Sequence, residues 1–156
     1  MKIAFAFFFA IGLIMAGPCS SAAAYGYFAE GAQLSVDQAL SIAEKHYEIA
    51  KLLIKEGRFD RVLPEMRKIL DLNLKGEYEQ SVAESSTLIA QLLDESKQTA
   101  LAQELLDETI ARMKQCGNIA SLLKVKAYFY KSSGQRQKAI ETFERAVEIE
   151  RQCPQQ

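Results

Sequence analysis

The sequence contains few of the residues that build catalytic or metal sites. It has one histidine, His46, and no second histidine or cysteine stands at the spacing that a metal ion requires. It has no glycine-rich phosphate loop, no G-x-S-x-G motif and no cysteine–histidine pairing. Its acidic residues stand singly in charged stretches, without an apolar pocket to perturb them. These absences argue against an enzyme, a metal site and a cofactor.

Net charge is also nearly absent. The 19 basic and 20 acidic residues leave a formal charge of −1, whereas proteins that bind nucleic acid usually carry a basic patch. We therefore expect no nucleic-acid partner. The charge is uneven along the chain, because residues 77–117 contain eight acidic and three basic residues, and residues 118–153 contain four acidic and seven basic ones. Such neighbours attract each other modestly.

A long apolar run occurs only at the N-terminus. Lys2 supplies a positive start, residues 3–15 are apolar, and Ala22 and Ala24 form an A-x-A-like cleavage site. The run is shorter than the roughly 18 to 20 residues that span a bilayer. This pattern predicts a signal peptide over residues 1–24 and export to the periplasm or out of the cell. The alternative is an uncleaved anchor, residues 3–16, that holds the chain at a membrane.

An aromatic linker, residues 25–34, would then begin the mature chain. It contains Tyr25, Tyr27 and Phe28, and aromatic side chains this dense rarely stay in water. They can pack against the following helices, insert at a membrane surface or contact a partner. The sequence leaves these alternatives open.

Residues 35–153 carry a helical pattern with almost no strand signal. Ser35 and Gln38 match a capping box at the start of the first helix, and apolar residues then recur every three or four positions. Breaks near Gly57, Gly76, Lys97, Gly117 and Gly134 divide the pattern into six helices. Short turns between them predict three antiparallel hairpins in an all-α fold.

The three hairpins share a repeat. When they are aligned on Gly57, Lys97 and Gly134, three groups of residues coincide: Ala50, Ala90 and Ala127; Val62, Ala102 and Ala139; Met66, Leu106 and Phe143. A small residue lets the two helices of a hairpin approach closely, and a large apolar residue one turn later fills the space to the next hairpin.

The third hairpin resembles the tetratricopeptide repeat family. The small, aromatic and turn residues of that repeat are matched by Ala127, Tyr130, Gly134, Ala139, Phe143 and Ala146. Leu123 replaces the usual tryptophan and Arg151 the terminal proline, and the spacings of about 40 and 37 residues exceed the family's 34. The resemblance implies three stacked hairpins over residues 35–153, a TPR-like α-solenoid. A generic stack of helical hairpins is the alternative.

The resemblance also implies a function in binding a protein or peptide partner, as an adaptor or assembly factor. In this family the first helix of each hairpin lines a concave face that takes extended peptides or helices. The exposed residues of that face would be Tyr47, Lys51, Lys55, Gln91, Asp94, Lys124, Tyr128 and Lys131. Two tyrosines and several lysines suit an acidic or C-terminal peptide, although solvated surface residues would show the same pattern.

Two cysteines remain beyond the leader, an even pair suited to an oxidising compartment. We place Cys116 and Cys153 at the exits of the second helices of adjacent hairpins, about 10 Å apart by helix packing. A disulfide requires Cα atoms within roughly 7 Å, so a bridge depends on movement of the helix ends. A disulfide and free thiols both remain open.

The last predicted helix has apolar residues that no further hairpin covers. Ile140 and Val147 lie on its outer side. A second copy of the chain or a partner would bury them, so a homodimer is one hypothesis.

Overall fold

The structure is a computed structural model that describes residues 34–153, and within these residues it contains helices and no strands. The predicted all-α class is therefore confirmed. The predicted signal peptide, and all of the aromatic linker except Leu34, lie outside the described residues. The elements are α1 (Val36–Lys55), the 3-10 helix η1 (Phe59–Arg61), α2 (Val62–Asp71), α3 (Glu77–Glu95), α4 (Thr99–Arg112), α5 (Cys116–Ser132) and α6 (Arg136–Gln152).

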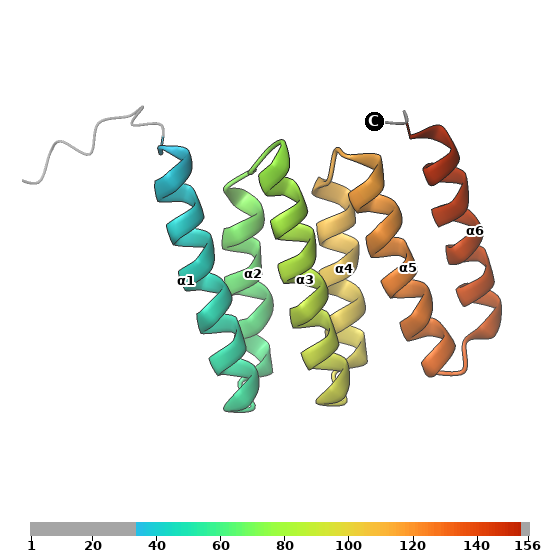
Figure 1. The fold of residues 1–156 in the computed structure, drawn as a ribbon. Coiled ribbons are helices and arrows are strands. Elements are labelled where there is room, and N and C mark those ends of the chain that lie inside the picture. The colour runs from blue at the N-terminus through green and yellow to red at the C-terminus, as the bar shows by residue number, and fades with distance from the viewer. Residues whose placement is uncertain (1–33, 154–156) are drawn as a thin grey trace, which may run out of the picture. The chain divides into compact units, whose positions relative to one another are not determined.

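The helices form three antiparallel hairpins that stack side by side. The pairs are α1 with α2, α3 with α4, and α5 with α6 (Figure 1). The first helices form one layer, in which α1 contacts α3 and α3 contacts α5, and α2 contacts α4 in the layer behind. The predicted stack of three hairpins is thus confirmed.

The predicted repeat places small side chains where the helices meet. Ala50, Ala90 and Ala127 have no exposed surface, and the paired residues Val62 and Ala102 are equally buried. A side chain that ends at Cβ keeps the backbones close, so apolar contact on both sides of the pair becomes continuous.

The three hairpin turns have one geometry. Gly57, Lys97 and Gly134 all adopt a left-handed backbone, with φ of 73°, 64° and 77°. In each turn the amide of the next residue donates to the carbonyl oxygen five residues earlier, at 2.8 Å, which is the Schellman arrangement that ends helices. The structure thus confirms the alignment from which the repeat was predicted.

The second helix is shorter than expected. Its pattern predicts a helix up to Gly76, but α2 ends at Asp71. The link to α3 contains two residues with positive φ, Asn73 at 49° and Gly76 at 64°. The backbone therefore leaves the helix before the apolar pattern stops.

The fifth helix begins at Cys116, one residue before the predicted break at Gly117. Its start is capped from another hairpin, because the carboxylate of Glu79 in α3 accepts the amides of Lys114 and Gln115 at 3.0 and 2.7 Å. Asn118 donates its side-chain amide to the same oxygen at 3.2 Å. Glu79 is almost fully buried. This carboxylate joins the second hairpin to the third and satisfies amides that have no partner within α5.

Cys116 and Cys153 form a disulfide, with their Cα atoms 5.7 Å apart. The predicted placement was wrong for Cys116, which begins α5 and does not end α4. The bridge therefore joins the start of α5 to the residue after α6, within one antiparallel hairpin, where such ends lie side by side. It fixes the free end of α6, a helix that packs mainly on α5.

His46 joins α1 to α2. Its Nδ1 lies 2.7 Å from Oε2 of Glu65, and Lys68 donates to the other carboxylate oxygen at 2.8 Å. The Glu65 side chain is only 7% exposed. The hydrogen bond from Lys68, and after it that of His46, lower the pKa of Glu65 against the opposing effect of burial.

Charged contacts also connect α2 to α4. Arg67 donates to both carboxylate oxygens of Glu108 and reaches Glu104 at 3.1 Å. Arg112 pairs with Asp71 one turn further along. Arg67 lowers the pKa of Glu108. These contacts fix the register of the first two hairpins, although such exposed pairs contribute little free energy each.

The shared turn geometry predicts that substitutions at Gly57 and Lys97 change the free energy of unfolding in opposite directions. Gly57→Ala should lower the free energy of unfolding by about 1 kcal/mol, because a side chain disfavours the left-handed backbone. A Cβ there would meet no atom within 4 Å, so backbone strain alone decides the loss. Lys97→Gly should raise the same free energy by up to about 1 kcal/mol. Urea unfolding measures both, and changes of the same sign would contradict the shared geometry.

The position of the disulfide predicts which helix loses stability when the disulfide is reduced. Opening a loop of 37 residues should lower the free energy of unfolding by about 3 to 4 kcal/mol in the chain-entropy model. Amide hydrogens of α6 should then exchange faster than those of α3, because α6 retains only its contact with α5. The control is the Cys116→Ser, Cys153→Ser variant, whose exchange should not respond to reductant. Equal acceleration in all helices would contradict this role.

The buried carboxylate predicts an acid-sensitive contact. Because the pKa of Glu65 is lowered in the folded chain, its contribution to stability is complete above the ordinary pKa of a glutamate. That contribution is lost as the pH falls through the lowered value. Glu65→Gln should flatten the fall in the free energy of unfolding below about pH 4.5. Glu48→Gln, at an exposed position of α1, is the control, and an unchanged slope for Glu65→Gln would reject the contact.

Candidate binding groove on the first helices

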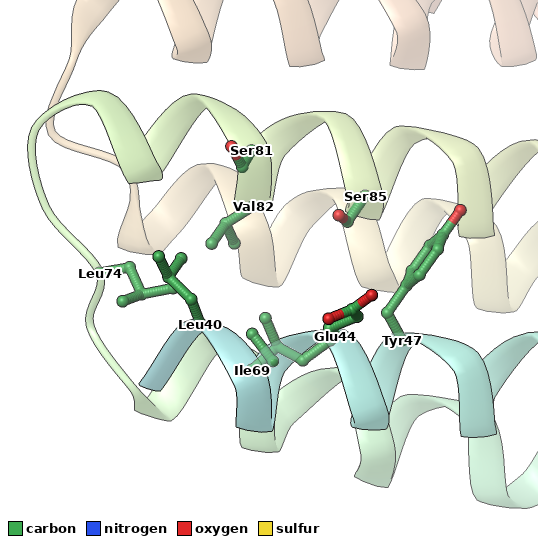
Figure 2. Close-up of a pocket in the computed structure, with 9 residues that line it drawn as sticks. Leu40, Glu44, Tyr47, Ile69, Leu74, Ser81, Val82 and Ser85 are labelled. Carbon is green, nitrogen blue, oxygen red and sulfur yellow. The ribbon is translucent and has the colours of Figure 1, made fainter. Parts of the chain in front are cut away.

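A hollow of about 190 Å³ lies between α1 and α3. Leu40 and Ala43 of α1, Leu74 of the link and Val82 of α3 form its apolar walls, with Ile69 of α2 beneath them (Figure 2). Its remaining lining residues are polar or amphipathic: Glu44, Tyr47, Ser81 and Ser85. The hollow thus combines an apolar floor with a polar rim, as binding pockets commonly do.

The hollow exists because the first hairpin is unequal. The 20 residues of α1 extend about 30 Å, whereas η1 and α2, which follow each other directly, extend about 21 Å together. The first turns of α1 therefore lack a partner helix. Leu74, in the link that replaces the missing turns, faces Leu40 at one end of the hollow (Figure 2).

Beyond the hollow, further side chains of both first helices lie on the same side. Tyr47 reaches from α1 toward α3 (Figure 2), and the Lys51 ammonium lies 4.9 Å from the centre of its ring. On α3, Ser81, Ser85 and Leu88 follow one another at helical spacing on one face, and Leu88 is 49% exposed. We call the lining of the hollow together with Lys51 and Leu88 the α1–α3 groove.

A second hollow, of about 430 Å³, lies on the other side of Leu74. Ile69, Leu74 and Val82 line both hollows. The second is also lined by Asp71 and Arg112, which pair with each other. Their ion pair occupies both charged groups, so this hollow is a weaker candidate for a binding site than the first one.

The residues predicted on α1 lie together. Tyr47 lines the hollow and Lys51 stands over its ring. Lys55 is exposed one turn further, in the last turn of α1. The structure therefore places the aromatic and cationic groups predicted for this helix along one side of the groove.

The two residues predicted on α3, Gln91 and Asp94, differ in exposure and in their hydrogen-bond partners. Gln91 is exposed one turn beyond Leu88. Asp94 is half-buried and accepts a hydrogen bond from the Thr99 hydroxyl at 2.6 Å. That bond connects the end of α3 to the start of α4, so Asp94 has a structural partner in the turn.

The residues predicted on α5 lie toward α6. Lys124 pairs with Glu150 of α6. Tyr128 packs edge-on against Phe143 of α6, with ring centres 5.2 Å apart. Lys131 is exposed on the same side of α5. The structure does not bring these three residues to the α1–α3 groove.

Sequence reasoning missed the apolar wall of the groove. Leu40 and Val82 follow the helical pattern of core residues, and Leu74 belongs to a stretch predicted as helix. Only the early end of α2 leaves them beside a hollow. The exposed Leu88 was the available signal, because it breaks the polar pattern of its face.

Further properties of the described residues bear on the type of site. Within residues 34–153, no group of three or more potential metal ligands lies together. No helix in the same part of the chain is long and apolar enough to span a membrane.

Comparison with known protein families gives a match to the third hairpin. A family model described as Tetratricopeptide repeat matches residues 120–153, most of α5 and all of α6. Neither the comparison with curated proteins nor that with solved structures gives a significant match. The predicted resemblance is confirmed where it was expected to be strongest. The tetratricopeptide repeat match covers the third hairpin, which lies at the end of an all-α stack of three helix hairpins.

Proposed function

We propose that this chain is an exported protein–protein interaction module, an adaptor or assembly factor that holds a partner segment in the α1–α3 groove. The tetratricopeptide repeat supports the general class, because such repeats mediate protein–protein interactions and are generally not enzymes. The observation that carries the proposal is the apolar hollow on the first-helix layer.

The size of the hollow favours a peptide over a small molecule. Sites for drug-sized ligands usually measure about 300 to 1,000 Å³, and this hollow measures about 190 Å³. It suits one apolar side chain of a longer segment, which then lies along the groove past Leu88. Such a segment gains most of its affinity from a buried anchor.

The charged residues at the rim determine where an acidic group of the partner can lie. Lys51 lies beyond Tyr47, about one turn of α1 from the hollow. This ammonium group donates to Glu48 at 2.8 Å, and a carboxylate on the partner, a few residues from the apolar anchor, would contact it beside Glu48 or in its place. Glu44, one turn before Tyr47 on the α1 wall of the hollow, disfavours a second carboxylate beside the anchor itself.

Export is part of the same proposal. It rests on the predicted signal peptide of residues 1–24 and agrees with the Cys116–Cys153 disulfide, since disulfides persist in oxidising compartments. The alternative is a membrane-tethered structural component that keeps residues 3–16 as an anchor. N-terminal sequencing of the protein recovered from its native membrane and exported fractions separates the two.

Filling the hollow tests the binding site. Peptides selected from a random display library on the whole chain should carry an apolar anchor followed within a few residues by an acidic side chain. Ala43→Phe places a ring in the hollow and should weaken the selected peptides at least tenfold, as fluorescence anisotropy measures. Ala100→Phe, at an exposed position of α4, is the matched control and should bind as the unaltered chain does.

Circular dichroism first checks that both variants keep their helices. Unchanged binding by a folded Ala43→Phe variant, or selected peptides without a shared apolar anchor, would reject the α1–α3 groove as the site.

A further inference from the structure

The outer side of the third hairpin exposes a group of apolar residues. Tyr128 of α5 is 58% exposed, and Ile140 and Val147 of α6 are 52% and 44% exposed. Phe143 lies between the two α6 residues in sequence, is half-buried and packs against Tyr128. These four residues form one surface, which we call the α5–α6 end face.

At the positions of Phe143 and Val147, the equivalent residues of the first two hairpins are buried, except Ile110, which is half-buried. Met66 and Leu106 occupy the position of Phe143 in the repeat, and neither has exposed surface. Leu70 occupies the position of Val147 and is only 4% exposed. In both hairpins the following hairpin covers this side, with α3 against the first and α5 against the second. Because a helix packs against this side of the first two hairpins, a helix also has the shape that fits the end face.

The end face has a basic border. Lys124 and Lys131 share the face of α5 that carries Tyr128, and Arg136 and Arg151 share the face of α6 that carries Ile140 and Val147. Two acidic residues lie beside them, Glu144 and Glu150, and Glu150 pairs with Lys124. Four cations and two anions leave a net charge of about +2 around the apolar residues.

The chain itself shows how such charges pair between hairpins. The second hairpin is acidic and the third is basic, and Asp107 of α4 contacts Lys126 of α5 at their interface. Lys126 is held there with only 14% of its side chain exposed. A helix that extends the stack beyond the basic third hairpin should accordingly be acidic.

We propose that the α5–α6 end face docks an amphipathic helix of another protein, with an apolar stripe flanked by aspartate or glutamate. The surface is separate from the α1–α3 groove, and the proposal does not depend on the function assigned to that groove. The helix would cover Ile140, Phe143 and Val147 as α5 covers Leu106 of the second hairpin.

A second copy of the chain fits this surface less well. Two end faces brought together would place cations against cations, which costs free energy. The opposite end of the stack exposes Ile49 and Leu52 of α1, but Lys45 and Glu56 on the same side of that helix cancel each other's charge. Neither surface of a second copy offers the acidic border that complements the end face.

The test uses two designed peptides of about 18 residues, a length at which isolated helices begin to be stable. Both have leucines at helical spacing on one face, and one is flanked by glutamates and the other by lysines. Binding to the whole chain is measured by fluorescence anisotropy. The glutamate peptide should bind at least tenfold more tightly than the lysine peptide, and added salt should reduce that ratio.

Paired variants locate the site. Ile140→Glu with Val147→Glu should weaken the glutamate peptide at least tenfold, and the helices should persist because both residues are exposed. Ile49→Glu with Leu52→Glu makes the same change at the opposite end of the stack and should leave binding unchanged. Ala43→Phe, which fills the groove, should also leave it unchanged.

Four results would overturn the proposal. Equal affinity for the two peptides would remove the charge argument, and unchanged binding by the Ile140→Glu, Val147→Glu variant would remove the site. Self-association by light scattering, abolished by that same variant, would assign the surface to a second copy instead. Loss of glutamate-peptide binding in the Ala43→Phe variant would place the peptide in the groove.

Discussion

Paired helices in this domain meet at one small side chain in each first helix, and the stack depends on that contact. Ala50, Ala90 and Ala127 are completely buried, so neighbouring backbones can approach as closely as a methyl group allows. Close approach brings large residues of the second helices, such as Met66 and Leu106, against the next hairpin. Each hairpin therefore buries its apolar side only when another helix follows, which is why such arrays are built by repetition.

Two surfaces of the domain lack the helical cover that this construction supplies elsewhere. Along the first hairpin, α2 is half as long as α1, and Leu40 and Leu74 border a hollow. At the third hairpin, no helix among the described residues covers Phe143. Both surfaces follow from the geometry of stacking and need no special residue. Apolar surface that residues 34–153 leave uncovered is a common basis for binding another protein.

Buried charges connect helices both within a hairpin and between hairpins. Glu79 of α3 accepts the amides at the start of α5, and Glu65 of α2 contacts His46 of α1. Each of these carboxylates is buried and accepts hydrogen bonds, as a charge in a protein interior requires. The two contacts hold the α-helices in register, while the alanines set their distance.

Local patterns in the sequence determined the helices, the turns and the repeat. Helical spacing depends on residues three and four apart, and the left-handed turn depends on the residues around Gly57, Lys97 and Gly134. These interactions are short-range, so the all-α class, the three hairpins and the tetratricopeptide likeness of residues 120–153 were predictable. The α1 part of the candidate site, Tyr47 and Lys51, followed from the same register.

Tertiary structure alone decided what those helices present to each other. A helical pattern places a side chain around its own axis, but it does not state which neighbouring helix ends first or which side remains uncovered. The early end of α2 created the hollow beside Leu40, and the partner on α6 drew Tyr128 against Phe143. The position of Cys116 at the start of α5 brought it beside Cys153, because antiparallel helices place the start of one next to the end of the other.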